Sequence, residues 1–127
     1  MGIKLVFLLI LGISASVWAY PKTECGSGPD HNLVQGRSEP GERLLYTNRV
    51  KMPKSFLRVK TYDFEWPNSS GAIFNHITRY EVLDQIHDGS GGCAFLTGGG
   101  PGTNFLKLHL KTQRGGSFDF FIYIYGR

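Results

Sequence analysis

Residues 104–127 carry the strongest pattern in the chain and read NFLKLHLKTQRGGSFDFFIYIYGR. In the first half, leucines alternate with Lys107, His109 and Lys111, and in residues 118–125 an apolar side chain recurs at every second position. Because successive side chains of a β-strand point to opposite faces, this period of two predicts two strands. The two glycines between them supply the positive φ that tight turns need. We therefore expect a hairpin, with its second strand at the centre of the sheet.

Upstream of residue 104, five further segments have strand patterning and are bounded by the Gly, Pro, Asn and Asp residues of turns. We expect strands at residues 32–37, 43–52, 55–64, 74–86 and 93–97. The glycine-rich stretches DGSGG at 88–92 and GGGPG at 98–102 predict a second hairpin and a tight turn. About seven short strands at regular spacing predict an all-β, single-domain antiparallel β-sandwich or flattened barrel over residues 32–127.

The first 19 residues have a different character. Lys4 precedes an apolar run at residues 5–13, and residues 17–19 read VWA, a plausible cleavage site. This order is typical of a cleaved secretory signal peptide, and the run is short for a membrane-spanning helix, although an uncleaved anchor is the alternative. We expect a secreted, extracellular chain with an extended segment at residues 20–31 and no membrane span after cleavage.

Cysteine and asparagine chemistry fits an exported chain. Cys25 and Cys93 would meet an oxidising compartment, where the simplest interpretation is one intramolecular disulfide. A loop of that length would stabilise the fold by about 4 kcal/mol in the chain-entropy model. Free thiols or an intermolecular bond are the alternatives. Asn68 begins the glycosylation sequon NSS in a connection between strands, which predicts a glycoprotein, with a polar turn as the alternative.

Cationic side chains gather on two of the expected strands. Arg58 and Lys60 lie on one, and Lys107 and Lys111 on another, so they form one possible binding face if these strands are neighbours. Three tyrosines would lie near this face, namely Tyr62, Tyr123 and Tyr125. Basic strands with aromatic residues can bind single-stranded nucleic acid or acidic glycans. We favour the alternative of a solvated sheet face whose long side chains cover apolar surface.

The net charge agrees with a modest role for electrostatics. The formal charge is +4, and removing Lys4 with the signal peptide lowers it to +3. This excess permits attraction to anionic surfaces without requiring it. Export would also separate the chain from nuclear nucleic acid, so we expect no nucleic-acid partner.

Six short motifs are specific in combination. They are PGERL at 40–44, FLRV at 56–59, DGSGG at 88–92, GGGPG at 98–102, QRG at 113–115 and IYGR at 124–127. Over residues 33–127 the chain resembles the insect multiprotein bridging factor 2 family. The family name implies a transcriptional co-activator that bridges a nuclear receptor and a general transcription factor. Many members, however, carry signal peptides and are described as salivary secreted peptides. Cys93 departs from the family pattern, so the expected disulfide depends on chemistry and not on the resemblance.

Residues that could carry catalysis form no convincing constellation. The chain lacks a Gly-x-Ser-x-Gly elbow and the i, i+4 histidine pair of a helical zinc site. Asp84, His87 and Asp88 cluster before the glycine-rich stretch and could form a metal or acid–base site. We favour a solvated loop with a turn-forming aspartate. The resemblance also implies no assigned catalytic residues, so we expect no enzyme activity, no metal and no cofactor.

Together these patterns favour a small secreted, non-enzymatic insect protein of saliva or gut. It would act as a monomer by binding an extracellular protein, a glycan or a microbial surface. One alternative is the nuclear co-activator that the family name implies. Another is a carrier of a small apolar ligand in a cavity of the barrel. An enzyme whose groups lie far apart in the sequence is a third.

Overall fold

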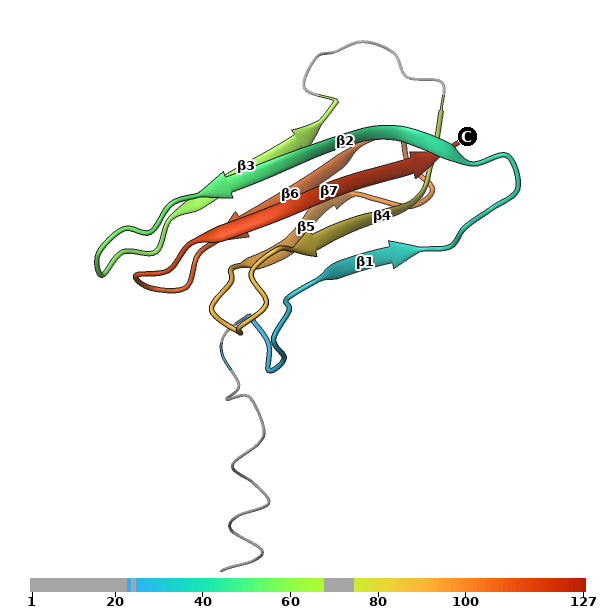
Figure 1. Ribbon diagram of the computed structural model, residues 1–127. Helices are drawn as coiled ribbons and strands as arrows, with labels where there is room; N and C mark the ends of the chain where they lie inside the picture. The colour runs from blue at the N-terminus through green and yellow to red at the C-terminus, as the bar shows by residue number, and fades with distance from the viewer. Residues whose placement is uncertain (1–22, 24, 68–74) are drawn as a thin grey trace, which may run out of the picture.

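The chain folds into two antiparallel sheets packed face to face (Figure 1). The computed structural model describes residue 23, residues 25–67 and residues 75–127. The predicted signal peptide and the sequon at Asn68 lie outside these residues. Within them, no helix is long and apolar enough to cross a bilayer.

Over the described residues, seven strands make up the two sheets, as the sequence predicts. The four-stranded sheet has the spatial order β1 (Leu33–Gly36), β4 (Ile77–Asp84), β7 (Phe118–Gly126) and β2 (Arg43–Met52). The three-stranded sheet has the order β3 (Thr61–Trp66), β6 (Leu106–Lys111) and β5 (Cys93–Gly99). The predicted all-β fold is therefore confirmed, and of the two predicted shapes the sandwich is the observed one.

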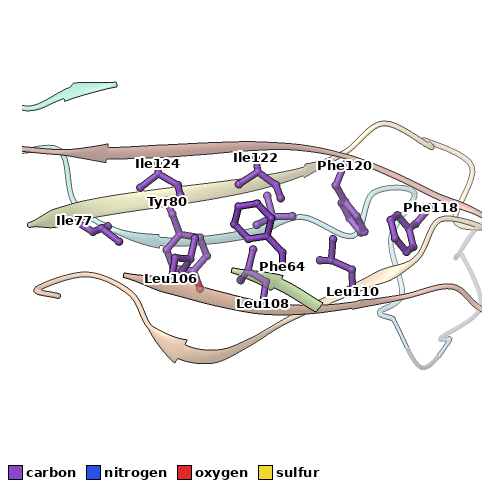
Figure 2. Close-up of a cluster of buried hydrophobic side chains, with 11 residues drawn as sticks. Phe64, Ile77, Tyr80, Leu106, Leu108, Leu110, Phe118, Phe120, Ile122 and Ile124 are labelled. Carbon is purple, nitrogen blue, oxygen red and sulfur yellow. The ribbon is translucent and has the colours of Figure 1, made fainter. Parts of the chain in front are cut away.

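The core lies between the sheets and comes mainly from their central strands. Every second residue of β6 and β7 is almost fully buried, which follows from the period of two in residues 104–127. Figure 2 shows the two sets facing each other, with Leu106, Leu108 and Leu110 on one side and Phe118, Phe120, Ile122 and Ile124 on the other. Burying each such side chain contributes roughly 1.5–3 kcal/mol, so these strands supply much of the driving force for folding.

The predicted C-terminal hairpin is wrong, although both of its strands form. β6 pairs with β3 and β5, whereas β7 pairs with β2 and β4. The connection at residues 112–117 therefore crosses from one sheet to the other. Each strand has one fully apolar face, and two such faces are buried more completely when stacked across a core than when placed side by side in one sheet. β7 does lie inside its sheet, as expected.

The stretch at residues 88–92 is also a crossing and not a hairpin, because β4 and β5 belong to different sheets. Its glycines permit close packing. A Cβ atom on Gly91 would lie 2.6 Å from a carboxylate oxygen of Asp84, and one on Gly92 would meet the Lys111 carbonyl oxygen. The glycines that indicated a hairpin in the sequence are thus needed for contact between the sheets.

The third predicted strand is displaced along the chain. It was expected at residues 55–64, but β3 begins at Thr61 and ends at Trp66. Before it the backbone turns, since the Arg58 N–H donates to the Ser55 carbonyl oxygen at 3.1 Å and Leu57 has a φ of 56°. The alternation of apolar and basic residues here therefore belongs to a connection at the end of the sandwich.

Candidate functional site

Three aromatic side chains line the solvent-facing side of β7. Phe121, Tyr123 and Tyr125 alternate with buried core residues and are half-buried on the outer face of the four-stranded sheet. The ring centroids of Phe121 and Tyr123 lie 6.1 Å apart, with an angle of 26° between the ring planes. Because β7 has a neighbour on each side, the rings occupy the middle of this face. We call Phe121, Tyr123 and Tyr125 the aromatic ladder.

Arg49 of β2 packs at one end of the aromatic ladder. The strand register places it opposite Phe121, with its guanidinium carbon 5.0 Å from the ring centroid. Its Nε and Nη2 donate to the two carboxylate oxygens of Asp119 at 2.9 and 2.6 Å. These bonds lower the pKa of Asp119 and raise that of Arg49. A charge-assisted, bidentate pair therefore fixes the guanidinium beside the ring.

Arg79 of β4 packs at the other end, with its guanidinium carbon 3.6 Å from the ring centroid of Tyr125. Its Nε donates to Glu42 at 2.7 Å and its Nη1 to Glu81 at 3.2 Å. Glu42 also accepts a hydrogen bond from the Thr78 hydroxyl at 2.7 Å. The bonds from Thr78 first, then Arg79, lower the pKa of Glu42 to about 2. This carboxylate is therefore ionised at neutral pH and holds the arginine against the ring.

The chemistry of this face combines aromatic ring surfaces with paired charges. Both arginines on the aromatic ladder are paired with carboxylates, so their charges are balanced locally. The pKa values of Glu42 and Asp119 are lowered, whereas a general acid or base at neutral pH needs a value near 7. Within the described residues, no three His, Cys, Asp or Glu side chains are placed to hold a metal ion. The face offers ring surfaces for stacking and fixed donors and acceptors for hydrogen bonds.

The four cations of the predicted binding face fall into two groups. Lys107 projects from the outer face of the three-stranded sheet, and its Nζ lies 3.7 Å from a carboxylate oxygen of Glu65. Arg58 and Lys60 belong to the β2–β3 connection at one end of the sandwich, where Lys111 ends β6. Lys107 and Lys111 both occupy outward-facing positions of β6, whereas Arg58 and Lys60 come before β3, so the predicted face is divided between a sheet and a connection.

The tyrosines expected beside those cations also lie apart. Tyr62 is on β3, whereas Tyr123 and Tyr125 are on the opposite sheet. The period of two puts Asp119, Phe121, Tyr123 and Tyr125 on one strand face, yet the predicted binding face included only the two tyrosines. The signal was present, because three aromatic residues occur at every second position on the outer side of a central strand. Arg49 and Arg79 gave no such signal, since they reach the ladder only through strand pairing.

The predicted disulfide between Cys25 and Cys93 is present. It joins the N-terminal segment to the first residue of β5, an edge strand.

Asp84 is buried, which corrects the prediction that it lies in a solvated loop. Its carboxylate accepts hydrogen bonds from the N–H groups of His31 and Ile86, each at 2.9 Å. Burial raises the pKa of Asp84. This carboxylate organises the junction between the N-terminal segment and β4.

His87 and Asp88, which the sequence groups with Asp84, lie in a solvated loop as predicted. Asp88 is exposed and accepts the Ser90 N–H at 3.0 Å, the turn-forming role that we favoured. His87 is exposed and its Nδ1 pairs with Asp30, which raises the pKa of His87. The three side chains therefore do not converge on one site.

The fold and the outer face define a small, disulfide-linked β-sandwich protein. The family model described as transcription activator MBF2 matches residues 35–126, and the chain belongs to this family. It is 38% identical over 97 residues to a probable salivary secreted peptide of Bombus ignitus, which covers 76% of this chain and 70% of that relative. The comparison with solved structures found no match. The family resemblance drawn from the six motifs is thus confirmed.

Proposed function

We propose that this protein is secreted, has no enzyme activity, and binds an uncharged glycan chain on its aromatic ladder. Secretion is supported by the similarity to a peptide named as salivary and secreted, and by a disulfide of the kind that persists in oxidising compartments. The main support for the binding role is the aromatic ladder, which is flanked by two arginines that are both paired with carboxylates.

The chemistry of the face selects the kind of partner. Aromatic rings offer apolar surface to the C–H faces of sugar rings, and the paired guanidinium and carboxylate groups offer donors and acceptors to hydroxyls. A phosphate or sulfate would instead need uncompensated cations, whereas Arg49 and Arg79 already bind Asp119 and Glu42. Three rings at every second residue span about 13 Å, which suits an extended polymer better than a compact metabolite.

The test is co-sedimentation of the secreted protein with insoluble neutral polysaccharides, namely chitin, cellulose and mannan. We expect binding to at least one of them and about a tenfold weaker association for Tyr123→Ala, because a stacking surface is removed. Tyr123→Phe keeps the ring and should bind more tightly than Tyr123→Ala. The matched control is Phe95→Ala, which removes an exposed ring from the outer face of the other sheet. An equal loss in the control, or a preference for heparin over all neutral polymers, would contradict the proposal.

The two remaining alternatives have less support. A nuclear co-activator, which the description of the family as a transcription activator suggests, would work in a reducing compartment that opposes the Cys25–Cys93 bond. A carrier of an apolar ligand needs an enclosed cavity, whereas core side chains occupy the space between the sheets (Figure 2). The groove of about 350 Å³ lined by Met52 and Phe118 is open to solvent.

A further inference from the structure

The β2–β3 connection presents two apolar side chains to solvent. Phe56 is 87% exposed and Leu57 is 62% exposed, the highest values among the large hydrophobic residues that the structure describes. We call Phe56 and Leu57 the apolar tip. Single exposed hydrophobic residues are common, but two adjacent ones on a loop form an apolar surface of the kind found at interaction sites.

The apolar tip is held in position by its neighbours. The connection between β6 and β7 lies beside it at one end of the sandwich (Figure 1). From there Arg114 Nη1 donates to the Leu57 carbonyl oxygen at 2.9 Å, and the Gly115 N–H donates to the Arg58 carbonyl oxygen at 2.8 Å. Leu57 has a φ of 56°, which is unfavourable for a bulky side chain. Strain of this kind persists where the surroundings impose it and occurs often at functional sites.

Basic residues flank the apolar tip in the sequence. Residues 49–60 read RVKMPKSFLRVK, with five basic residues and no acidic one. Arg114 adds a sixth cation through its bond to Leu57. Acids near this end include Asp119, which is paired with Arg49, Asp88, whose pKa Lys54 helps to lower, and the buried Asp84. The loop therefore combines a protruding apolar pair with a local cationic excess.

We propose that the apolar tip inserts into the headgroup region of an anionic lipid bilayer, while the surrounding lysines and arginines contact lipid phosphates. Apolar burial and attraction to anionic lipids are the two contributions that hold proteins reversibly at a membrane surface. The open groove of about 350 Å³ at the foot of the loop, with Met52 and Pro53 in its lining and Lys51 and Lys54 beside them, extends this amphipathic surface. The site goes beyond the proposed glycan-binding role, because Phe56, Leu57 and Lys54 do not belong to the aromatic ladder.

The first test is co-sedimentation of protein recovered from the culture medium, so that the leader does not contribute, with lipid vesicles. We expect binding to an equimolar mixture of phosphatidylglycerol and phosphatidylcholine, and much weaker binding to phosphatidylcholine alone. Phe56→Ala should reduce the partition coefficient about tenfold, and Lys54→Gln about fivefold. The matched control is Phe105→Ala, which removes an exposed ring beyond the opposite end of β6 and should bind as the wild type does.

A second variant separates lipid contact from loss of folding. Leu57→Gly removes the side chain and suits the left-handed backbone, so its melting temperature should equal or exceed that of the wild type while vesicle binding falls. Phe56→Trp should keep binding, and its emission should shift to the blue with anionic vesicles and be quenched by brominated lipids.

Several results would overturn the proposal. One is equal binding by the wild type, Phe56→Ala and Leu57→Gly, and another is unshifted emission from Phe56→Trp. A complete absence of vesicle binding would do the same and would direct the search to a protein partner for the apolar tip. None of these vesicle results bears on polysaccharide binding by Tyr123, so the two proposals can fail independently.

Discussion

At the scale of single residues, Tyr80 is the exception to an otherwise apolar core. Its side chain is fully buried between the sheets, and among the described residues no group hydrogen-bonds its hydroxyl (Figure 2). Burial without a partner raises the pKa of Tyr80 to about 12. A buried hydroxyl without a hydrogen bond destabilises a fold, so the ring stabilises this core while its hydroxyl opposes that effect.

Replacing Tyr80 with phenylalanine should therefore stabilise the protein. We expect Tyr80→Phe to raise the free energy of unfolding by about 1 kcal/mol, because the ring stays and the unpartnered hydroxyl is removed. Urea denaturation followed by fluorescence measures this change. Tyr123→Phe on the outer face is the matched control and should leave the free energy of unfolding unchanged. A less stable Tyr80→Phe variant would mean that the hydroxyl has a hydrogen-bond partner after all.

At the scale of elements, Glu42 joins the turn before β2 to strand β4. Its carboxylate accepts hydrogen bonds from the hydroxyls of Thr78 at 2.7 Å and Ser38 at 3.1 Å, and from Arg79 at 2.7 Å. The pKa is lowered from 4.5 to about 2. A lowered carboxyl pKa means that the folded protein binds the proton less tightly than the unfolded chain does. The resulting stability is present above about pH 4.5 and is lost as the pH falls toward 2.

This linkage predicts a difference between two variants. The free energy of unfolding of the wild type minus that of Glu42→Gln should shrink as the pH falls from 5 to 2. Asp84 acts in the opposite direction, because burial raises its pKa, but it is common to both proteins and drops out of the difference. Urea denaturation across this pH range is the measurement. Glu65→Gln, at an exposed ion pair, should show a smaller change. A difference that does not depend on pH would contradict the assigned role of Glu42.

At the scale of the whole molecule, the disulfide limits how far the N-terminal segment can separate from the sandwich. Cys25 and Cys93 are 68 positions apart, and Cys93 begins the edge strand β5. Closing a loop of that length reduces the entropy of the unfolded chain. The bond therefore stabilises the fold from outside the central core.

Removing both cysteines should lower stability without changing the fold. For the double variant Cys25→Ala with Cys93→Ala we expect a loss of up to about 4 kcal/mol in the free energy of unfolding. Thermal and urea denaturation measure it, and reducing the wild type with dithiothreitol should reproduce the shift. Circular dichroism should still report β-structure. An unchanged melting temperature in both experiments would show that the bond does not contribute to stability.

The positions of individual strands were easier to predict than which strands pair with each other. β2 was predicted with its observed bounds, because its apolar alternation ends at Pro53. The turn residues at 88–92 and 113–117 predict hairpins, yet both stretches cross between the sheets. Glycine-rich turn chemistry is local, and it is the same whether the chain returns beside its own strand or passes to the opposite sheet. The choice depends on which arrangement buries more apolar surface, and distant strands decide that.

The aromatic ladder and the apolar tip also show which features depend on the local sequence and which depend on the tertiary structure. By itself the sequence determined the all-β class, the family, the single core and the alternation that directs Phe121, Tyr123 and Tyr125 to one face, since these depend on residue type and period. Only the tertiary structure decided that Arg49 and Arg79 flank that ladder and that Arg114 meets Leu57, because these contacts join positions far apart in the chain. Strand pairing and sheet packing complete both surfaces proposed for binding, and no local pattern encodes those long-range contacts.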